Sequence, residues 1–402
     1  MQQTFTALKY RNYRLWFFGQ MISLFGTWMQ TTAQGYLVFQ ITQSPAYLGY
    51  VGFASGVPSW LFMLYGGVVA DRVPRRALLI ITQTSMMALA FILAALTAAQ
   101  LVQAWHIIVL AFLLGTANAF DAPARLAFVN ELVEREDMTN AIALNATMFN
   151  TATAIGPAVA GMTYALVGPA WCFTINGLSF IAVIAALSMM KIAAQSRSAR
   201  PASTRSDLKE GIRYAVTEPT IRTIIGIVGM VSLFGISFIA LVPAWAVKVL
   251  GGDATTNGLL QAARGVGALI GALFLASLGR FKFKGRLLTI GTLTFPILLI
   301  GFTTIRWLPL ALLMLVGVGA AFVLMMNLSN ALVQTLVPDV LRGRVMSVYS
   351  LVFFGLMPIG SLWAGALAER IGEPSVVALG ASIMLGFAAL LYLFVPKVRR
   401  LE

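Results

Sequence analysis

Uncharged stretches long enough to cross a lipid bilayer recur along the whole chain. A transmembrane helix needs about 20 predominantly apolar residues, and on that measure the sequence predicts twelve spans. They run over residues 14–40, 46–70, 77–99, 104–125, 140–166, 170–191, 222–248, 255–279, 286–304, 308–333, 342–368 and 374–396. Hydrophobic residues make up 59% of the chain and charged residues 10%, against roughly 45–50% and about 25% in soluble domains. The chain is therefore predicted to be an all-α integral membrane protein.

Lysine and arginine gather in alternate segments between the predicted spans. If the N-terminus is cytoplasmic, the inner segments hold 24 of the 28 Lys and Arg residues, and the outer side holds only Lys248, Arg306 and Arg370. Since positively charged loops stay on the cytoplasmic side of a membrane, both termini are expected there. Topology and attraction to membrane lipids then explain the net charge of +14, and no nucleic-acid partner is expected.

The residue inventory argues against metal binding and covalent catalysis. The chain has one cysteine, Cys172, and one histidine, His106. A single thiol forms neither an internal disulfide nor a multi-thiolate metal site. A membrane-embedded enzyme would need clustered His, Asp or Cys at one membrane depth, which the predicted spans lack. We therefore expect a protein that is not an enzyme, with no metal and no cofactor.

The longest hydrophilic segment divides the predicted spans into two sets of six. We expect an N-terminal half over residues 1–191, a cytoplasmic linker over 192–221 and a C-terminal half over 222–402. The linker contains the sequence DLKEGIRYAV, whose spacing predicts a helix suited to the membrane surface.

The two halves share short sequence matches. The sequence NELV at 130–133 recurs as NALV at 330–333. Three further positions are matched 209 residues later: Gly49 by Gly258, Gly56 by Gly265, and Arg75 by Lys284. Together these matches predict a parallel repeat of two six-helix pseudo-repeats.

A carboxylate and three arginines follow the second predicted span, in the sequence GVVADRVPRR at 67–76. It resembles the signature loop of the major facilitator superfamily, Gly-x-x-x-Asp-Arg-x-Gly-Arg-Arg/Lys, with Pro74 in place of the usual glycine. The sequences LRGRVMS at 341–347 and DAPARLAFVNELV at 121–133 resemble cytoplasmic segments of bacterial drug and siderophore exporters, the branch that contains enterobactin exporters. The second copy of the loop, SLGRFKFKGR, has lost the aspartate and carries Arg280 at its place.

The fifth predicted span carries a further likeness. The sequence IGPAVAG at 155–161 resembles the Gly-Pro motif common in antiporters of the superfamily. It places Gly156, Pro157 and Gly161 in an antiporter-like motif, and Pro157 is expected to bend the span.

The resemblance implies that the loop at 67–76 is a gating latch. Asp71 would face the start of the eleventh span near residues 340–344, where the helix dipole favours an anion, and Arg75 would pair with Asp121. Such a cluster would hold the two halves together and break when the inner side opens. The other predicted members are Gly67, Arg72, Arg76, Arg342 and Arg344. The alternative is a plain basic membrane anchor, which would explain Arg72 and Arg76 but not Asp71.

Polar residues inside the spans predict a substrate cavity. Arg264 lies about 14 Å along its span at about 1.5 Å per residue, near the bilayer midplane, where a charge costs about 3 kcal/mol and usually faces a cavity. The alternative is an arginine that snorkels or binds backbone carbonyls. The other candidates are Gln30, Gln34, Asn145, Asn150, Gln261 and Asn327, each of which could equally form an interhelical hydrogen bond.

The resemblance implies a secondary transporter of the bacterial cytoplasmic membrane. It would export an amphipathic small molecule, such as a drug, a siderophore or a related metabolite, by alternating access with proton antiport. No Asp or Glu lies at the centre of a span, so a coupling proton would need Asp71, Asp121, Glu369 or the substrate itself. The alternatives are a lysophospholipid or other lipid transporter of the same fold, and a membrane receptor or scaffold that transports nothing.

Overall fold

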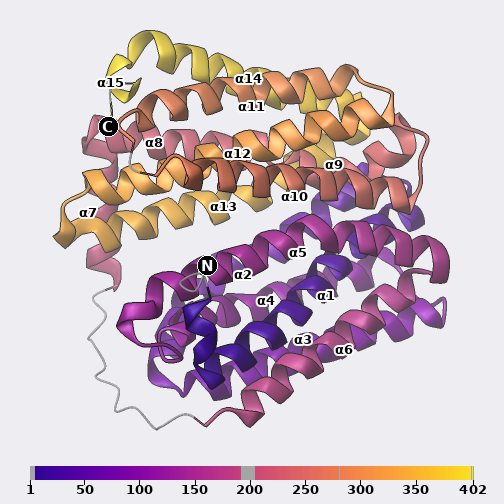
Figure 1. The fold of residues 1–402 in the computed structure, drawn as a ribbon. Coiled ribbons are helices and arrows are strands. Elements are labelled where there is room, and N and C mark those ends of the chain that lie inside the picture. The colour runs from indigo at the N-terminus through magenta and orange to yellow at the C-terminus, as the bar shows by residue number, and fades with distance from the viewer. Residues whose placement is uncertain (1–4, 192–203, 280, 400, 402) are drawn as a thin grey trace. The chain divides into compact units, whose positions relative to one another are not determined.

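The computed structural model describes residues 5–191, 204–279, 281–399 and 401, and within them the chain is helical with no strand. Figure 1 shows the helices in order. The first half contains α1 (Arg11–Thr42), α2 (Pro45–Arg72), α3 (Arg75–Ala98), α4 (Ala104–Val129), α5 (Met138–Val167) and α6 (Pro169–Met189). Short 3₁₀ turns, η1 (Thr6–Lys9) and η2 (Arg135–Asp137), precede α1 and α5.

Helix α7 (Thr204–Thr217) lies within the predicted linker, and it confirms the helix predicted from DLKEGIRYAV. A single long rod follows, composed of α8 (Pro219–Met230), η3 (Val231–Gly235), α9 (Phe238–Ala244) and η4 (Trp245–Val249). The remaining helices are α10 (Ala254–Ser277), α11 (Lys284–Thr304), α12 (Leu308–Leu336), α13 (Asp339–Ile371), α14 (Glu373–Phe394) and α15 (Pro396–Arg399). Arg280, on which the comparison of the two loops depends, lies outside the described residues.

Membrane-spanning helices dominate the described part of the chain. Nine helical runs there are long and apolar enough to cross a bilayer, and α2 is a tenth when its two segments, bent by 57°, are taken together. Helices α1 and α5 have 32 and 30 residues, which at about 1.5 Å per residue also exceeds a bilayer core of about 30 Å. These rods lie at the twelve predicted spans, and the all-α prediction is confirmed.

Glycine and proline set the same boundary in both halves. Gly168 ends α5 with φ of 91°, and Gly372 ends α13 with φ of 82°. A side chain strains this left-handed backbone, so glycine is required at both turns. Pro169 and Pro374 then occupy the first turn of α6 and α14, where a missing N–H costs nothing.

The chain forms two compact units. Unit 1 contains Met1–Thr42, Ala54–Ala202 and Ala254–Gly258, and unit 2 contains Gln43–Phe53, Ser203–Asp253 and Leu259–Glu402. Each unit therefore includes the start of one helix, α10 in unit 1 and α2 in unit 2, from the other half of the sequence.

Glycines allow these short segments to pack. In unit 1, a Cβ on Gly161 of α5 would lie 2.6 Å from the carbonyl oxygen of Ala254. In unit 2, a Cβ on Gly365 of α13 would lie 2.7 Å from the Cα of Gly49 in α2. Both distances are shorter than a carbon atom tolerates, so only glycine permits such close backbone contact.

Helices α10 and α12 of unit 2 also touch backbone to backbone. A Cβ on Gly267 would lie 1.9 Å from the carbonyl oxygen of Val316, and one on Gly319 would lie 2.0 Å from that of Arg264. This contact fixes the backbone that carries the buried Gln261 and the half-buried Arg264.

Candidate functional site

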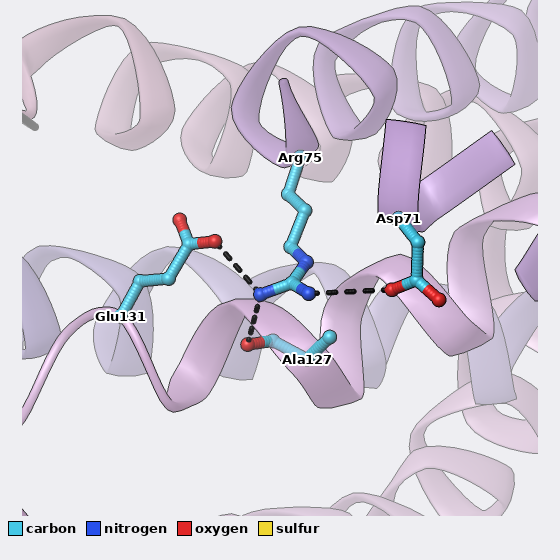
Figure 2. A network of polar contacts seen from close by, with 4 residues as sticks. All are labelled: Asp71, Arg75, Ala127 and Glu131. Carbon is cyan, nitrogen blue, oxygen red and sulfur yellow. Dashed lines mark hydrogen bonds and ion pairs between the residues drawn. The ribbon is translucent and has the colours of Figure 1, made fainter. Parts of the chain in front are cut away.

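The end of α2, the start of α3 and the end of α4 meet in a polar cluster of Asp71, Arg75, Ala127 and Glu131, called the Arg75 cluster below (Figure 2). Arg75 is the first residue of α3, directly after Pro74, which caps that helix. Its Nη1 donates hydrogen bonds to Glu131 Oε1 at 2.8 Å and to the carbonyl oxygen of Ala127 at 3.2 Å. Its Nη2 donates to Asp71 Oδ1 at 3.4 Å.

The two carboxylates of the Arg75 cluster differ in their environment. The Glu131 side chain is 10% exposed and that of Arg75 20% exposed, whereas the Asp71 side chain is 74% exposed. An ion pair is stronger when it is short and shielded from water. The Arg75–Glu131 contact is therefore the principal ion pair, with Asp71 as a weaker, solvated partner.

The partner of Arg75 is thus Glu131 rather than the predicted Asp121. Asp121 lies ten residues earlier, about 15 Å along the chain at helical rise, and it is completely buried in α4. Its Oδ1 accepts hydrogen bonds from Thr82 Oγ1 and Gln83 Nε2 of α3, both at 2.9 Å. Its Oδ2 accepts no hydrogen bond from any described residue and lies 3.7 Å from Arg125 Nε.

The other predicted latch residues have varied surroundings. In unit 1, Gly67 has open space where a Cβ would lie, Arg72 is exposed, and Arg76 Nη2 donates to the carbonyl oxygen of Ser188 at 2.7 Å. In unit 2, Arg342 pairs with Asp339 of its own helix, and Arg344 pairs with Glu210 of α7. Asp71 and residues 340–344 belong to different units, so their approach remains a prediction.

Sequence reasoning missed Glu131 and Glu210 as partners. Glu131 stands in the NELV sequence that recurs as NALV, so the first copy alone carries a carboxylate at this position. That difference between copies was the available signal. Glu210 had no such signal, because its role depends on how α7 packs against α13.

Gln30 and Gln34 are buried in α1 of unit 1. Gln30 Oε1 accepts a hydrogen bond from Asn176 Nδ2 of α6 at 2.7 Å, so it joins two helices as the alternative interpretation proposed. Asn145 and Asn150 are half-buried on α5. In the antiporter-like motif, Pro157 lies inside α5, and a Cβ on Gly156 would lie 2.7 Å from the Cβ of Trp28 in α1.

The candidates of unit 2 lie on α10 and α12. Gln261 is buried, and one turn later Arg264 is half-buried, with its Nε enclosed and lacking a hydrogen-bond partner among the described residues. Asn327 of α12 is exposed. A buried guanidinium N–H without an acceptor is costly, which suits a group that awaits a ligand. Because the seven cavity candidates are divided between two units, the predicted cavity remains a prediction.

The seventh predicted span contains a feature that the sequence did not reveal. Two π-helical segments, η3 and η4, interrupt it. A π segment releases backbone groups from the regular ladder and is frequent at functional sites. In η3 the carbonyl oxygen of Leu233 accepts a hydrogen bond from Trp363 Nε1 of α13 at 2.7 Å. The interruption is therefore supported by a side chain of the neighbouring helix.

The segment before α1 is tied to the start of α5. Lys9 Nζ lies 2.6 Å from Asp137 Oδ2, and the Tyr10 hydroxyl donates to the same oxygen at 2.9 Å. The hydrogen bond from Lys9 lowers the pKa of Asp137, and the same bond raises the pKa of Lys9.

A family model described as transmembrane secretion effector matches residues 2–402. The chain is 26% identical over 361 residues to the staphyloferrin A transporter of Staphylococcus aureus, covering 89% of this chain and 90% of that protein. It is 26% identical over 390 residues to the multidrug efflux pump Tap of Mycolicibacterium fortuitum, covering 94% of each. It is 23% identical over 415 residues to macrolide efflux protein A of Streptococcus pyogenes, covering 98% and 99%.

Solved transporter structures share the fold. A bacterial homolog of the human lysosomal transporter Spinster, in an inward-facing and unoccupied conformation, superposes with a TM-score of 0.71 at 15% identity, covering 97% of this chain and 98% of that one. The nucleoside transporter NupG gives a TM-score of 0.74 at 15% identity, with coverage of 96% and 100%. At these identities the likeness concerns the fold alone, and it confirms the major facilitator architecture.

Proposed function

Since the chain belongs to the transmembrane secretion effector family of the major facilitator superfamily, we propose that it exports an amphipathic small molecule by alternating access. It is a multi-pass membrane transporter and not an enzyme. The observation that carries the export direction is the near full-length similarity to proteins named as a multidrug efflux pump and a macrolide efflux protein. The third relative is named as a siderophore transporter.

The proposed location is the bacterial cytoplasmic membrane, with both termini in the cytoplasm. The distribution of Lys and Arg supports this orientation, because the basic loops then face the compartment that retains them. Within the exported class, Arg264 favours substrates with anionic or hydrogen-bond-accepting groups, since its enclosed Nε has no acceptor among the residues that the structure describes.

Proton antiport is proposed as the driving reaction, with Asp121 as the group that carries the proton. Asp121 is completely buried, and only one of its oxygens accepts hydrogen bonds. The charged group nearest its other oxygen is Arg125, at 3.7 Å. A buried carboxylate whose cation moves away takes up a proton rather than keep an unpaired charge. Arg125 is therefore the cation through which a conformational change would act on Asp121.

Proteoliposomes of purified protein test this proposal with four solutes: a macrolide, a fluorescent cationic drug, a metal-free siderophore and a lysophospholipid. We expect an imposed pH gradient to drive at least one of the first three. Asp121→Asn should abolish the response to the gradient while solute exchange without a gradient continues. Glu136→Gln, which alters an exposed carboxylate of η2, is the matched control and should behave as wild type.

The outcomes separate the parts of the proposal. Gradient-driven transport by Asp121→Asn at the wild-type rate would exclude Asp121 as the proton carrier. Transport of the lysophospholipid alone would establish the lipid-transporter alternative. Movement of none of the four solutes would contradict export of this class.

A further inference from the structure

An open groove runs along an exposed, apolar face of unit 1, over the floor formed by α1 and α6. It consists of two adjoining cavities of about 440 and 430 Å³ that share Ile22. The first cavity also lies against α5, and the second ends at Arg14. The lining is almost entirely apolar, with Leu178 and Phe18 about half exposed.

Small residues of the floor keep the groove open. A Cβ on Gly19 would lie 2.9 Å from the Cβ of Ala186, and one on Gly26 would lie 2.4 Å from Ser179 Oγ. These glycines let α1 and α6 approach closely, so the floor between the two helices is made of backbone and small side chains. Ala182 and Ala185 of α6 line the lower cavity in the same way.

The length of the groove matches a lipid chain. Fifteen residues of α1 separate Arg14 from Met29, which is about 22 Å of helix. One leaflet of a bilayer contributes about 15 Å, half of a hydrocarbon core of about 30 Å. The groove therefore extends through a whole leaflet, from the headgroup level at Arg14 to slightly beyond the midplane.

Basic side chains gather at the Arg14 end. Asn12 Nδ2 donates to the carbonyl oxygen of Lys191 at 2.9 Å, which brings the end of α6 beside the start of α1. Arg11, Arg14 and Lys191 are all exposed there. In the part of the chain that the structure describes, none of these three cations pairs with a carboxylate, although Lys9 nearby pairs with Asp137.

A cavity in the second half differs from this groove in volume and in the surroundings of its basic residue. The cavity between α8, α11 and α14 has a volume of only about 20 Å³. Its basic residue, Arg399, stacks over the ring of Tyr392 at 4.4 Å from the centroid. That space is filled by the protein itself, and its cation already has a partner.

We propose that the α1–α6 groove is a binding site for an anionic phospholipid of the cytoplasmic leaflet. One acyl chain lies on the floor formed by Gly19 and Gly26, and the phosphate contacts Arg14 with Arg11 and Lys191 nearby. The anionic class follows from charge complementarity, because each cation near a membrane surface attracts acidic lipid. This inference rests on the proposed orientation, which places the Arg14 end in the cytoplasmic leaflet.

Native mass spectrometry of the purified protein in detergent tests the site with dioleoylphosphatidylglycerol and dioleoylphosphatidylcholine, which differ only in the headgroup. We expect wild type to bind one phosphatidylglycerol about tenfold more tightly than phosphatidylcholine. Arg11→Gln with Arg14→Gln should reduce that preference to about twofold. Arg399→Gln, the matched charge control at the filled cavity, should keep it.

A second variant tests the acyl-chain floor. Ala185→Trp places an indole in the lower cavity from an exposed position, and it should remove the single tight site for both lipids. Ala389→Trp, at an exposed position of α14, is the control and should not. Thermal unfolding curves establish that each variant is folded.

Three results would overturn the lipid site: equal affinity of wild type for both lipids, an unchanged preference in the double arginine variant, or equal losses in the two tryptophan variants. A dimer that Ala185→Trp abolishes would assign the groove to a second copy of the chain instead. These measurements use no substrate and no gradient, so they can fail while export stands, and export can fail while they succeed.

Discussion

In the first half, the start of α5 is tied to the segment before α1 by Asp137 and Lys9, and in the second half the start of α13 is tied to α7 by Arg344 and Glu210. The plan is the same, since a segment that precedes the first span of each half holds the fifth span of that half. The polarity is reversed, because the acid belongs to the fifth span in one half and the base in the other. Both halves therefore have an ion pair at the corresponding position, but the acid and the base have exchanged places.

The Arg75 cluster has no such counterpart. Lys284 stands at the place of Arg75, but within the described residues it forms no ion pair, and Ala331 stands where Glu131 does. The first half thus has the Arg75 cluster, which connects α2, α3 and the segment after α4, and the described residues of the second half form no such cluster. If the Arg75 cluster gates transport, the residues that form this gate belong to the first half.

The largest effect on stability is expected at the close helix contacts that both units form through a glycine. Gly161→Val in unit 1 and Gly365→Val in unit 2 each force a side chain against backbone at 2.6–2.7 Å. Each should lower stability by about 3 kcal/mol, the upper range for overpacking. Thermal unfolding in detergent measures both. A loss in only one variant would show that the two crossings are not equivalent.

The Arg75 cluster should give the next largest difference in stability between variants of the two halves. Arg75→Gln removes the 2.8 Å ion pair with the nearly buried Glu131 and should cost about 2 kcal/mol. Lys284→Gln removes a charge that forms no ion pair with any described residue, and it should change stability by less than about 0.5 kcal/mol. The comparison uses the same unfolding assay. Equal losses would mean that the second half holds Lys284 by an ion pair after all.

Asp71→Asn should separate gating from stability. Its exposed contact with Arg75 at 3.4 Å should contribute less than about 0.5 kcal/mol, so insertion and unfolding should match wild type. Transport in proteoliposomes should nevertheless fall severalfold if Asp71 is part of the latch. Full transport activity would leave the loop as a basic anchor.

The ion pair between Asp137 and Lys9 should give the smallest effect, which is present at intermediate pH and lost at the extremes. Lys9 lowers the pKa of Asp137, so the stability that the pair contributes is present above the unfolded pKa of about 3.9 and is lost as pH falls through the folded pKa. The raised pKa of Lys9 gives the opposite limit, since the contribution is lost only as pH rises beyond about 10.4. The unfolding temperatures of wild type and Asp137→Asn should therefore differ at pH 5–9 and converge below about pH 4. Glu136→Gln should show no such convergence.

The apolar runs and the basic loops were enough to predict the spans, because the bilayer imposes a length and a charge pattern on them. The Arg75 partner was not predictable in the same way. Span four was expected to end at residue 125, which makes Asp121 its inner carboxylate, but α4 continues to Val129 and brings Glu131 to that end. Gln30 could not be distinguished from a ligand contact, because the sequence does not show that Asn176 faces it. The π segments leave no residue pattern at all.

The close contact of α10 and α12 has a consequence for directed evolution. Every alternative to glycine adds at least a Cβ, and at Gly267 and Gly319 that atom would fall 1.9–2.0 Å from a carbonyl oxygen. A mutant library that randomises these two positions would therefore consist mainly of destabilised clones. Randomising Gln261, Arg264 and Asn327 is more useful, because substitutions at these positions of α10 and α12 leave the contact between the two backbones unchanged.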